Sequence, residues 1–141
     1  IQVYKTQVKR FENICCIYSC APFITSEILL KAYDLLIQKK FDTVFPIIAY
    51  SFPIQRALRV NQGKVSMILK DNLNIRSQDL EKSFHDAGQF YWSNTNQLLI
   101  SEKLITSNSG GIEISELEAQ DIDNKTDWKL AELKYKLKLD A

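Results

Sequence analysis

The chain has 141 residues, of which 45% are hydrophobic and 25% charged. These values are typical of a globular protein, exclude disorder over most of the length, and predict one domain over residues 1–141. Lys and Arg number 18 against 17 Asp and Glu, a net charge of +1. The balance excludes a strongly basic nucleic-acid-binding protein, so we expect no nucleic-acid partner.

The first part of the chain alternates helical and extended patterns. Residues 1–11 carry apolar side chains at helical spacing. Residues 14–18 form a short apolar run that predicts a strand buried on both faces, as in a parallel sheet. Thr25 has the character of an N-cap, and a helix is predicted over residues 26–40.

The middle of the chain combines a strand with an excursion. Residues 43–50 have strand character, and Pro46 within them indicates an edge strand or a bulge. We predict that residues 51–85 leave the sheet, with a hairpin whose turn lies at residues 61–63. Residues 70–87 have no clear period, and so long an irregular segment is usually functional.

Short elements complete the chain. We predict a strand over residues 88–92, a short helix over 96–105, a loop over 106–111, a strand over 112–117 and a final helix over 126–138. Strands and helices therefore alternate around an inserted hairpin. This order predicts an α/β fold with a mostly parallel sheet and an antiparallel excursion.

The cysteines indicate the compartment. Three cysteines are an odd number, which favours reduced thiols in a cytoplasmic protein over a disulfide scaffold. His85 brings the possible zinc ligands to four, but Cys15 and Cys16 are adjacent in a predicted strand and would face opposite ways.

No apolar run is long enough for a membrane helix, so we expect no membrane partner. The start at Ile1 suggests processing or a truncated chain.

Two carboxylates are the first candidates for chemistry. Asp121 and Asp123 are spaced to share one face of an extended segment, while Ile122 points back to the core. Such a pair suits a hard cation such as Mg²⁺. The alternative is that both aspartates, with Asn124, solvate a loop and cap the final helix. Spacing alone favours this alternative.

Other candidates come from the second half of the excursion. Arg76 can clamp a carboxylate or a phosphate, or it is a solvated surface arginine. His85 precedes Asp86, but no nucleophile elbow accompanies them, so a histidine that contacts substrate or is simply hydrogen-bonded is favoured over a catalytic triad. Aromatic residues 90–92 could stack on bases, and a packed sheet explains them better.

Five blocks of the sequence, in their order and spacing, resemble one family. Together they are similar to the bacterial pseudaminic acid cytidylyltransferases, a branch of the acylneuraminate cytidylyltransferase (CMP-sialic acid synthetase) family. The resemblance extends over nearly the whole chain. The blocks are Cys15-Cys16-Ile17-Tyr18-Ser19-Cys20-Ala21-Pro22-Phe23, Phe52-Pro53-Ile54-Gln55-Arg56-Ala57, Arg76-Ser77-Gln78-Asp79-Leu80, His85-Asp86-Ala87-Gly88-Gln89-Phe90-Tyr91-Trp92 and Gln120-Asp121-Ile122-Asp123 with Asp127-Trp128.

The resemblance implies an enzyme that joins CTP to a nine-carbon α-keto acid sugar, releases pyrophosphate and requires Mg²⁺. It implies a Rossmann-like nucleotide-diphospho-sugar transferase fold. Family members are homodimers, which makes residues 51–85 a dimerisation and substrate-contact hairpin.

Residue roles follow only where the blocks match. Asp121 and Asp123 correspond to the family's catalytic, metal-binding aspartates. Tyr18 stands where members that act on sialic acid usually carry a glutamine, which favours pseudaminic acid as the sugar. The substrate-binding set is then Tyr18, Arg76, Gln78, His85 and Gln89.

The sequence also departs from the family. The family opens with a glycine-rich basic loop around the CTP phosphates, whereas this chain has four glycines, and Gly110-Gly111 is followed by Ile112-Glu113. We therefore interpret the chain as the C-terminal portion of such an enzyme. Two alternatives stay open: an enzyme for sialic, legionaminic or a deoxy-octulosonic acid, and a catalytically silent fragment that forms dimers.

Overall fold

A computed structural model describes residues 10–139. The helix predicted over residues 1–11 lies outside this range except for Arg10 and Phe11, which are not helical. The chain divides into two compact units. One is built from the chain up to Ile47 and from Asp86 onward, and the other is Ile48–His85. The second unit occupies almost the same residues as the predicted excursion.

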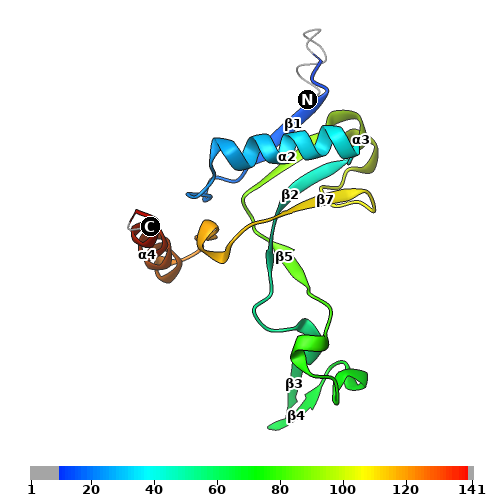
Figure 1. Ribbon diagram of the computed structural model, residues 1–141, viewed down its shortest axis with the longest axis vertical. Helices are drawn as coiled ribbons and strands as arrows, with labels where there is room; N and C mark the ends of the chain where they lie inside the picture. The colour runs from blue at the N-terminus through cyan, green and yellow to red at the C-terminus, as the bar shows by residue number, and fades with distance from the viewer. Residues whose placement is uncertain (1–9, 140–141) are drawn as a thin grey trace. The chain divides into compact units, whose positions relative to one another are not determined.

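The strands of the first unit belong to a five-stranded sheet (Figure 1). Its strand order is β1-β6-β2-β5, and β7 also pairs with β2. β6 is antiparallel to both β1 and β2, whereas β7 is parallel to β2. β1, β2 and β7 therefore run in one direction and β6 runs against them. The strands are β1 (Asn13–Ile17), β2 (Thr43–Ala49), β5 (Phe84–Asp86), β6 (Phe90–Asn94) and β7 (Ser109–Glu113).

The α/β class is thus confirmed, but the prediction of a mostly parallel sheet is wrong for the described strands. The prediction of parallel strands came from the apolar run at residues 14–18, and apolar composition does not determine the direction of a strand. After the excursion the chain returns to the sheet as β6, which lies between β1 and β2 and runs in the opposite direction to both. Both contacts of β6 are therefore antiparallel.

Pro46 does not mark an edge strand, which was one of the two predicted alternatives. It is fully buried within β2, which pairs with both β6 and β7. The ladder to β6 is formed at Thr43 and Val44, before the proline, and the Pro46 carbonyl accepts a hydrogen bond from the Ala87 N–H at 3.0 Å. The proline is tolerated because its missing N–H falls beyond that ladder.

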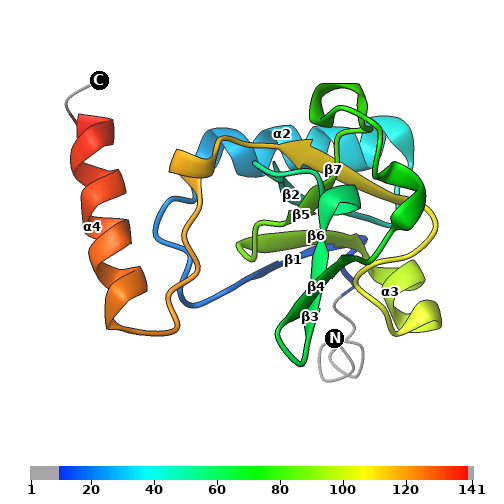
Figure 2. The same cartoon turned by 90° about the horizontal axis from the view of Figure 1, so that it is seen from below.

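Helix α2 (Ser26–Lys39) covers one face of the sheet, as Figure 2 shows from a second direction. The predicted N-cap is confirmed, since the Thr25 side chain accepts a hydrogen bond from the Ile28 N–H at 3.3 Å. The apolar side of the helix packs onto the middle strands. The fully buried centre of this core consists of Ala32, Leu36, Val44 and Phe90.

β1 is less buried than predicted. Ile17 at its end is 53% exposed and Cys16 is exposed, while Cys15 is partly covered. Within the described residues β1 pairs with β6 alone, so one of its edges has no neighbouring strand. All three cysteines are free thiols, and burial raises the pKa of Cys15 to about 11.

The glycine pair lies in a strand and not in the predicted loop over residues 106–111. Gly110 and Gly111 belong to β7 beside β2. A Cβ on Gly110 would lie 2.4 Å from the Phe41 ring, and one on Gly111 would lie 2.7 Å from Ile47 Cδ1. The glycines therefore serve close packing, which the sequence pattern did not reveal.

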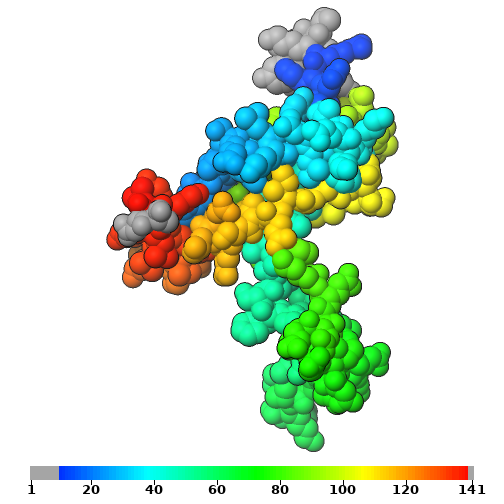
Figure 3. All heavy atoms as spheres, in the orientation of Figure 1, coloured from blue at the N-terminus to red at the C-terminus, as the bar shows by residue number. Residues whose placement is uncertain are grey.

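Two helices and a short turn follow the central strands. α3 (Thr95–Ser101) begins at the Asn94 cap, and α4 (Lys125–Leu139) ends the described chain. The strand predicted over residues 112–117 is replaced at its end by the 3₁₀ turn η4 (Glu116–Glu118). In Figure 3 the atoms of η4 lie beside those of α4. None of the described helices is long and apolar enough to cross a membrane.

The second unit contains the predicted hairpin. β3 (Leu58–Asn61) and β4 (Lys64–Met67) pair antiparallel. Gln62 and Gly63 both have positive φ, 49° and 76°, as a two-residue type I′ turn requires. The remaining residues include three 3₁₀ turns, η1 (Ile54–Arg56), η2 (Lys70–Asn72) and η3 (Ser77–Asp79).

Truncating the core of α2 tests this packing. Leu36→Ala should lower the free energy of unfolding by about 3 kcal/mol, because it removes a side chain that is 2% exposed and leaves a cavity. Leu30→Ala, on the same helix but 63% exposed, is the matched control and should cost less than about 0.5 kcal/mol. Urea unfolding measures both, and equal losses would contradict the assignment of the core face.

Candidate functional site

Several segments of the first unit meet at one edge of the sheet. Because β6 runs against its neighbours, its first residues lie at the carboxyl ends of β1 and β2. The Tyr18 N–H, just after β1, donates to the Gln89 carbonyl at 2.9 Å. The Ala87 N–H donates to the Pro46 carbonyl in β2 at 3.0 Å. Ligands of open α/β sheets bind at such carboxyl ends.

A tight turn before β6 brings one predicted aspartate to this edge. Gly88 has φ +64°, a conformation that favours glycine, and its N–H donates to Asp86 Oδ1 at 2.8 Å. A Cβ built on Gly88 would lie 3.8 Å from Asp121 Oδ2. The Asp121 carboxylate therefore lies against the backbone of this turn, although Asp121 is distant from Gly88 in the sequence.

The start of α4 shows which residues cap that helix. Asn124 Oδ1 accepts hydrogen bonds from the backbone N–H groups of Thr126 and Asp127 at 2.8 and 3.2 Å. Asp127 Oδ2 accepts from the N–H groups of Asp123 and Asn124 at 3.0 and 3.1 Å. The capping half of the alternative is thus confirmed for Asn124, with Asp127 as a second capping residue, and not for the Asp121 and Asp123 side chains. The exposure of these two carboxylates is compatible with a solvated loop as well as with a bound cation.

The two candidate carboxylates are exposed and available. Within residues 10–139, neither the Asp121 nor the Asp123 side chain forms a hydrogen bond or an ion pair. Between residues 113 and 127 the chain carries six acidic side chains and one basic side chain. A local excess of acidic side chains attracts a cation.

The donor set fits a magnesium ion that is shared with a substrate. In the described part of the chain, no group of three or more His, Cys, Asp or Glu side chains is placed to hold a metal by itself. Mg²⁺ is commonly held by one or two carboxylates together with phosphate oxygens and water. Asp121 and Asp123 supply the right type and number of carboxylates for that arrangement, and the described residues do not form an all-protein metal cage.

Tyr18 belongs to an aromatic and acidic network at the same edge. Its ring packs on Tyr91 with centroids 5.4 Å apart, and Phe45 packs on Tyr91 at the same distance. The Tyr91 hydroxyl donates to Asp86 Oδ2. Burial, together with the hydrogen bond to Asp86, raises the pKa of Tyr91 well above its usual range. Tyr18 itself remains 43% exposed, so its ring is accessible to a ligand.

Gln89 lies at this edge but is not open to solvent. Its side chain is 2% exposed, and its amide Nε2 donates to the Glu118 carbonyl at 2.6 Å. Lys134 Nζ of α4 donates to the neighbouring Ala119 carbonyl at 2.8 Å. Both contacts hold the segment that leads to Asp121. A substrate contact by Gln89 stays a prediction.

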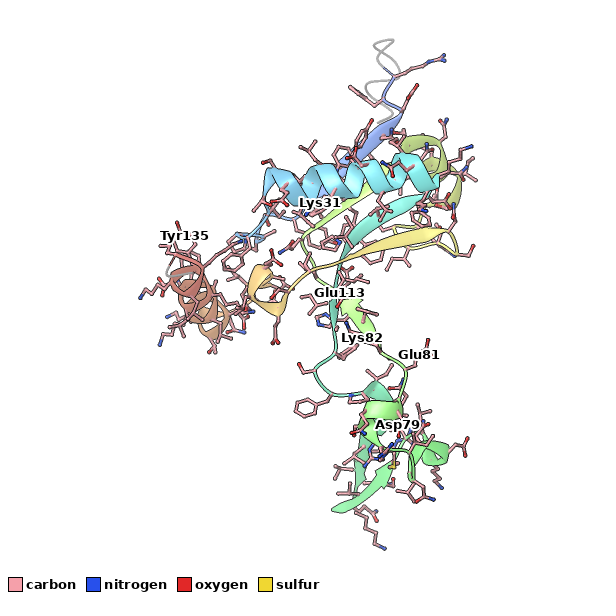
Figure 4. The ribbon with its side chains drawn as sticks, viewed as in Figure 1. Lys31, Asp79, Glu81, Lys82, Glu113 and Tyr135 are labelled. Carbon is pink, nitrogen blue, oxygen red and sulfur yellow. The ribbon has the colours of Figure 1, made fainter. Side chains whose placement is uncertain are left out.

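The other three predicted substrate residues belong to the second unit. Arg76 donates from Nε to Asp79 Oδ2 at 2.8 Å, an exposed ion pair within its own sequence block, and Asp79 is labelled in Figure 4. Gln78 is exposed in η3, and the His85 ring lies 5.0 Å from the Tyr50 ring. Their substrate roles also stay predictions.

An apolar pocket of about 180 Å³ lies beneath α4. Ile122 lines it, which agrees with the expectation that this side chain turns back between the two aspartates. Figure 4 labels Tyr135 on α4, which lines the same pocket. Its other lining residues are Pro22, Phe23, Trp128, Ala131 and Glu132.

Sequence reasoning missed two members of this edge, Asp86 and Tyr91, as parts of the site. The sequence indicates Asp86 only as a neighbour of His85, and Tyr91 only as an aromatic residue that packs in a sheet or stacks on bases. The Asp-x-Gly spacing of Asp86 and Gly88 is a local turn signal. It could have indicated the turn, but not that Asp121 lies against it.

Comparison with known proteins supports the resemblance. No family model matches the chain. The chain is 31% identical over 138 residues to a protein of Campylobacter jejuni serotype O:2 named pseudaminic acid cytidylyltransferase, and equally to its counterpart in serotype O:23/36. It is 30% identical over 117 residues to a Helicobacter pylori protein named pseudaminic acid cytidylyltransferase and UDP-2,4-diacetamido-2,4,6-trideoxy-beta-L-altropyranose hydrolase.

The extent of these matches differs between the chains. The Campylobacter matches cover 97% of this chain and 60% of each relative. The Helicobacter match covers 82% of this chain and 22% of that protein. The chain therefore spans about three fifths of the length of the first relatives, and nearly all of it takes part in the similarity.

The raised pKa of Tyr91 predicts a pH dependence. A folded-state pKa above the unfolded value of about 10 stabilises the fold fully below that pH and progressively less above it. Between about pH 9 and pH 11, the free energy of unfolding should fall more steeply for the wild type than for Tyr91→Phe, which cannot ionise. Urea unfolding across this range measures both slopes, and parallel slopes would contradict the assignment.

Proposed function

We propose that this chain is the sugar- and metal-binding part of a cytidylyltransferase that transfers CMP from CTP to pseudaminic acid and releases pyrophosphate. The observation that carries the proposal is the similarity along 97% of the chain to proteins named pseudaminic acid cytidylyltransferase. Its structural support is the unengaged Asp121 carboxylate at the carboxyl edge of the sheet, with the exposed Asp123 carboxylate two residues later in the chain.

We also propose that the first unit has a nucleotide-diphospho-sugar transferase fold. Three strands that run in one direction, β1, β2 and β7, support this, because they place their carboxyl ends at a common edge. The reversed β6 brings the Gly88 turn to that edge, where it meets Asp121. We place the protein in the cytoplasm because its cysteines are odd in number and free.

In this proposal Asp121 and Asp123 hold Mg²⁺ together with CTP phosphate oxygens. When bound, the ion supplies positive charge to the α-phosphate and lowers the pKa of the sugar's anomeric hydroxyl. The residues of the chain bind and orient the sugar so that its hydroxyl attacks the phosphorus and pyrophosphate leaves. Such transfer depends mainly on positioning and electrostatics.

We assign sugar binding to the aromatic pair formed by Tyr18, just after β1, and Tyr91 in β6. Tyr18 offers a half-exposed ring and hydroxyl, and the buried Tyr91 ring packs against it. An aromatic ring accommodates the apolar patches of a deoxygenated, acylated sugar better than a glutamine amide does. This favours pseudaminic acid over sialic acid. Arg76, Gln78 and His85 are proposed as further sugar contacts.

A pyrophosphate-release assay tests the function. CTP is offered with pseudaminic, sialic, legionaminic and deoxy-octulosonic acids, both to this chain and to a polypeptide of the relatives' length. Turnover with pseudaminic acid supports the proposal, and turnover with another sugar alone would reassign the substrate. Binding without turnover in both polypeptides would favour the silent, dimer-forming alternative.

The metal assignment predicts the effect of one neutralising substitution. In a preparation that turns over CTP, Asp123→Asn should lose most activity and keep its fold, because it removes a charge and almost no volume. Asp34→Asn, an exposed aspartate on α2, is the matched control and should retain activity. Normal turnover of Asp123→Asn at saturating Mg²⁺ would refute the assignment.

We further propose a homodimer formed through the hairpin. One face of β3 and β4 is wholly apolar, because Leu58 pairs with Met67 and Val60 pairs with Val65. Leu58, Val60 and Val65 are 58%, 69% and 62% exposed. A two-stranded hairpin is marginal in water unless its apolar face is covered, and a second copy offers the same face around a two-fold axis.

The dimer makes a direct prediction for the mass in solution. Light scattering at micromolar concentration should give about twice the chain mass of 16.3 kDa. Val60→Lys should shift the mass to that of the monomer, because it places a charge in the apolar face. Arg59→Lys, on the opposite face of the same strand, should leave the dimer intact. A wild-type mass near 16.3 kDa would show that the hairpin does not pair.

A further inference from the structure

We propose that Asp86 is a positioning residue that fixes both the sugar side and the metal side of the site through its two carboxylate oxygens. The inference rests on the proposed function and adds a residue to it. Neither Asp86 nor its partner Tyr91 was predicted from the sequence as part of the site. The contacts of each oxygen can be followed separately.

The first oxygen controls the turn beneath the metal aspartate. Asp86 Oδ1 accepts the Gly88 N–H at 2.8 Å and so closes the turn in which Gly88 has φ +64°. Asp121 Oδ2 would lie 3.8 Å from a Cβ on Gly88. The Asp121 carboxylate thus lies against a backbone segment whose shape depends on Asp86. Loss of this bond would let the turn relax and remove the surface on which Asp121 rests.

The second oxygen controls the aromatic side. Asp86 Oδ2 accepts the Tyr91 hydroxyl hydrogen. The Tyr91 ring is held between Tyr18 and Phe45, each with its centroid 5.4 Å away. Since Tyr91 is 5% exposed and Tyr18 is 43% exposed, the buried ring serves as the platform for the accessible one. The orientation of Tyr18 therefore depends on Asp86 through Tyr91.

The placement of Asp86 argues for a supporting role and against direct substrate contact. It is half-buried, and each of its oxygens already accepts a hydrogen bond from the protein. Groups that orient a metal ligand or a substrate-contacting residue in this way commonly change affinity by about tenfold when removed. Asp86 is the point at which the Gly88 turn and the tyrosine pair are joined.

Three variants separate the two oxygens. Asp86→Ala removes both contacts, whereas Tyr91→Phe removes only the aromatic one. Asp42→Ala is the matched control, because Asp42 also accepts through both oxygens, from Thr106 Oγ1 at 2.8 Å and Asn108 Nδ2 at 3.0 Å, outside the candidate site. Should Asp86→Ala fail to fold by circular dichroism, Asp86→Asn, which keeps one acceptor oxygen, replaces it.

The first measurement is Mn²⁺ binding to this chain, followed by the paramagnetic broadening of the Gly88 amide signal. The dissociation constant should rise about tenfold in Asp86→Ala and stay unchanged in Tyr91→Phe and Asp42→Ala. An unchanged constant in Asp86→Ala, with wild-type binding intact, would overturn the inference and leave the proposed function standing. Absence of Mn²⁺ binding by the wild type would overturn both.

The second measurement uses a preparation with turnover and compares the two Michaelis constants. The KM for pseudaminic acid should rise about tenfold in Tyr91→Phe while the KM for CTP stays constant, and Asp86→Ala should show the same rise. A merely structural role would lower the folded fraction without separating these constants. Equal changes in both constants for Tyr91→Phe would therefore refute the sugar-side contact.

Discussion

The first unit depends on one strand that runs against its neighbours. β6 lies between β1 and β2, and Phe90 at its start is fully buried against α2. Because β6 is antiparallel to both, its amino end and the turn before it lie at the carboxyl ends of β1 and β2. In a wholly parallel sheet that position would be occupied by loops following strands. Here it is occupied by a short turn whose backbone is tied to both neighbouring strands.

The direction of β6 also determines what lies beside the Asp121 carboxylate. The turn supplies a rigid backbone surface at Gly88, and Asp121 lies against it. The side chains of Asn124 and Asp127 accept hydrogen bonds from the backbone N–H groups around the start of α4. The carboxylates of Asp121 and Asp123 take no part in this capping. These are the two carboxylates that the proposed function assigns to a bound cation.

The features that the sequence predicted well are those determined by near neighbours. The Thr25 cap, the turn at Gln62-Gly63 and the helical spacing of α4 each depend on a few consecutive residues. The features that it missed depend on contacts distant in the chain. The direction of β6 is seen only in its pairing with β1 and β2, and strand position 110 requires a glycine because the Phe41 ring leaves no room for a Cβ. No local pattern records either fact.

The same distinction applies to the site. The full set selected by the resemblance was Tyr18, Arg76, Gln78, His85, Gln89, Asp121 and Asp123. The structure brings Tyr18, Gln89 and Asp121 to one edge of one unit, whereas three other selected residues belong to the second unit. It also separates their roles, since the buried Gln89 holds the segment before Asp121 while Tyr18 faces solvent. A motif lists residues without distinguishing those that touch a ligand from those that hold the others in place. That difference is decided by burial and by the hydrogen-bond partner of each polar atom. In sequence Asp86 is next to His85, but its carboxylate oxygens accept hydrogen bonds from Gly88 and Tyr91.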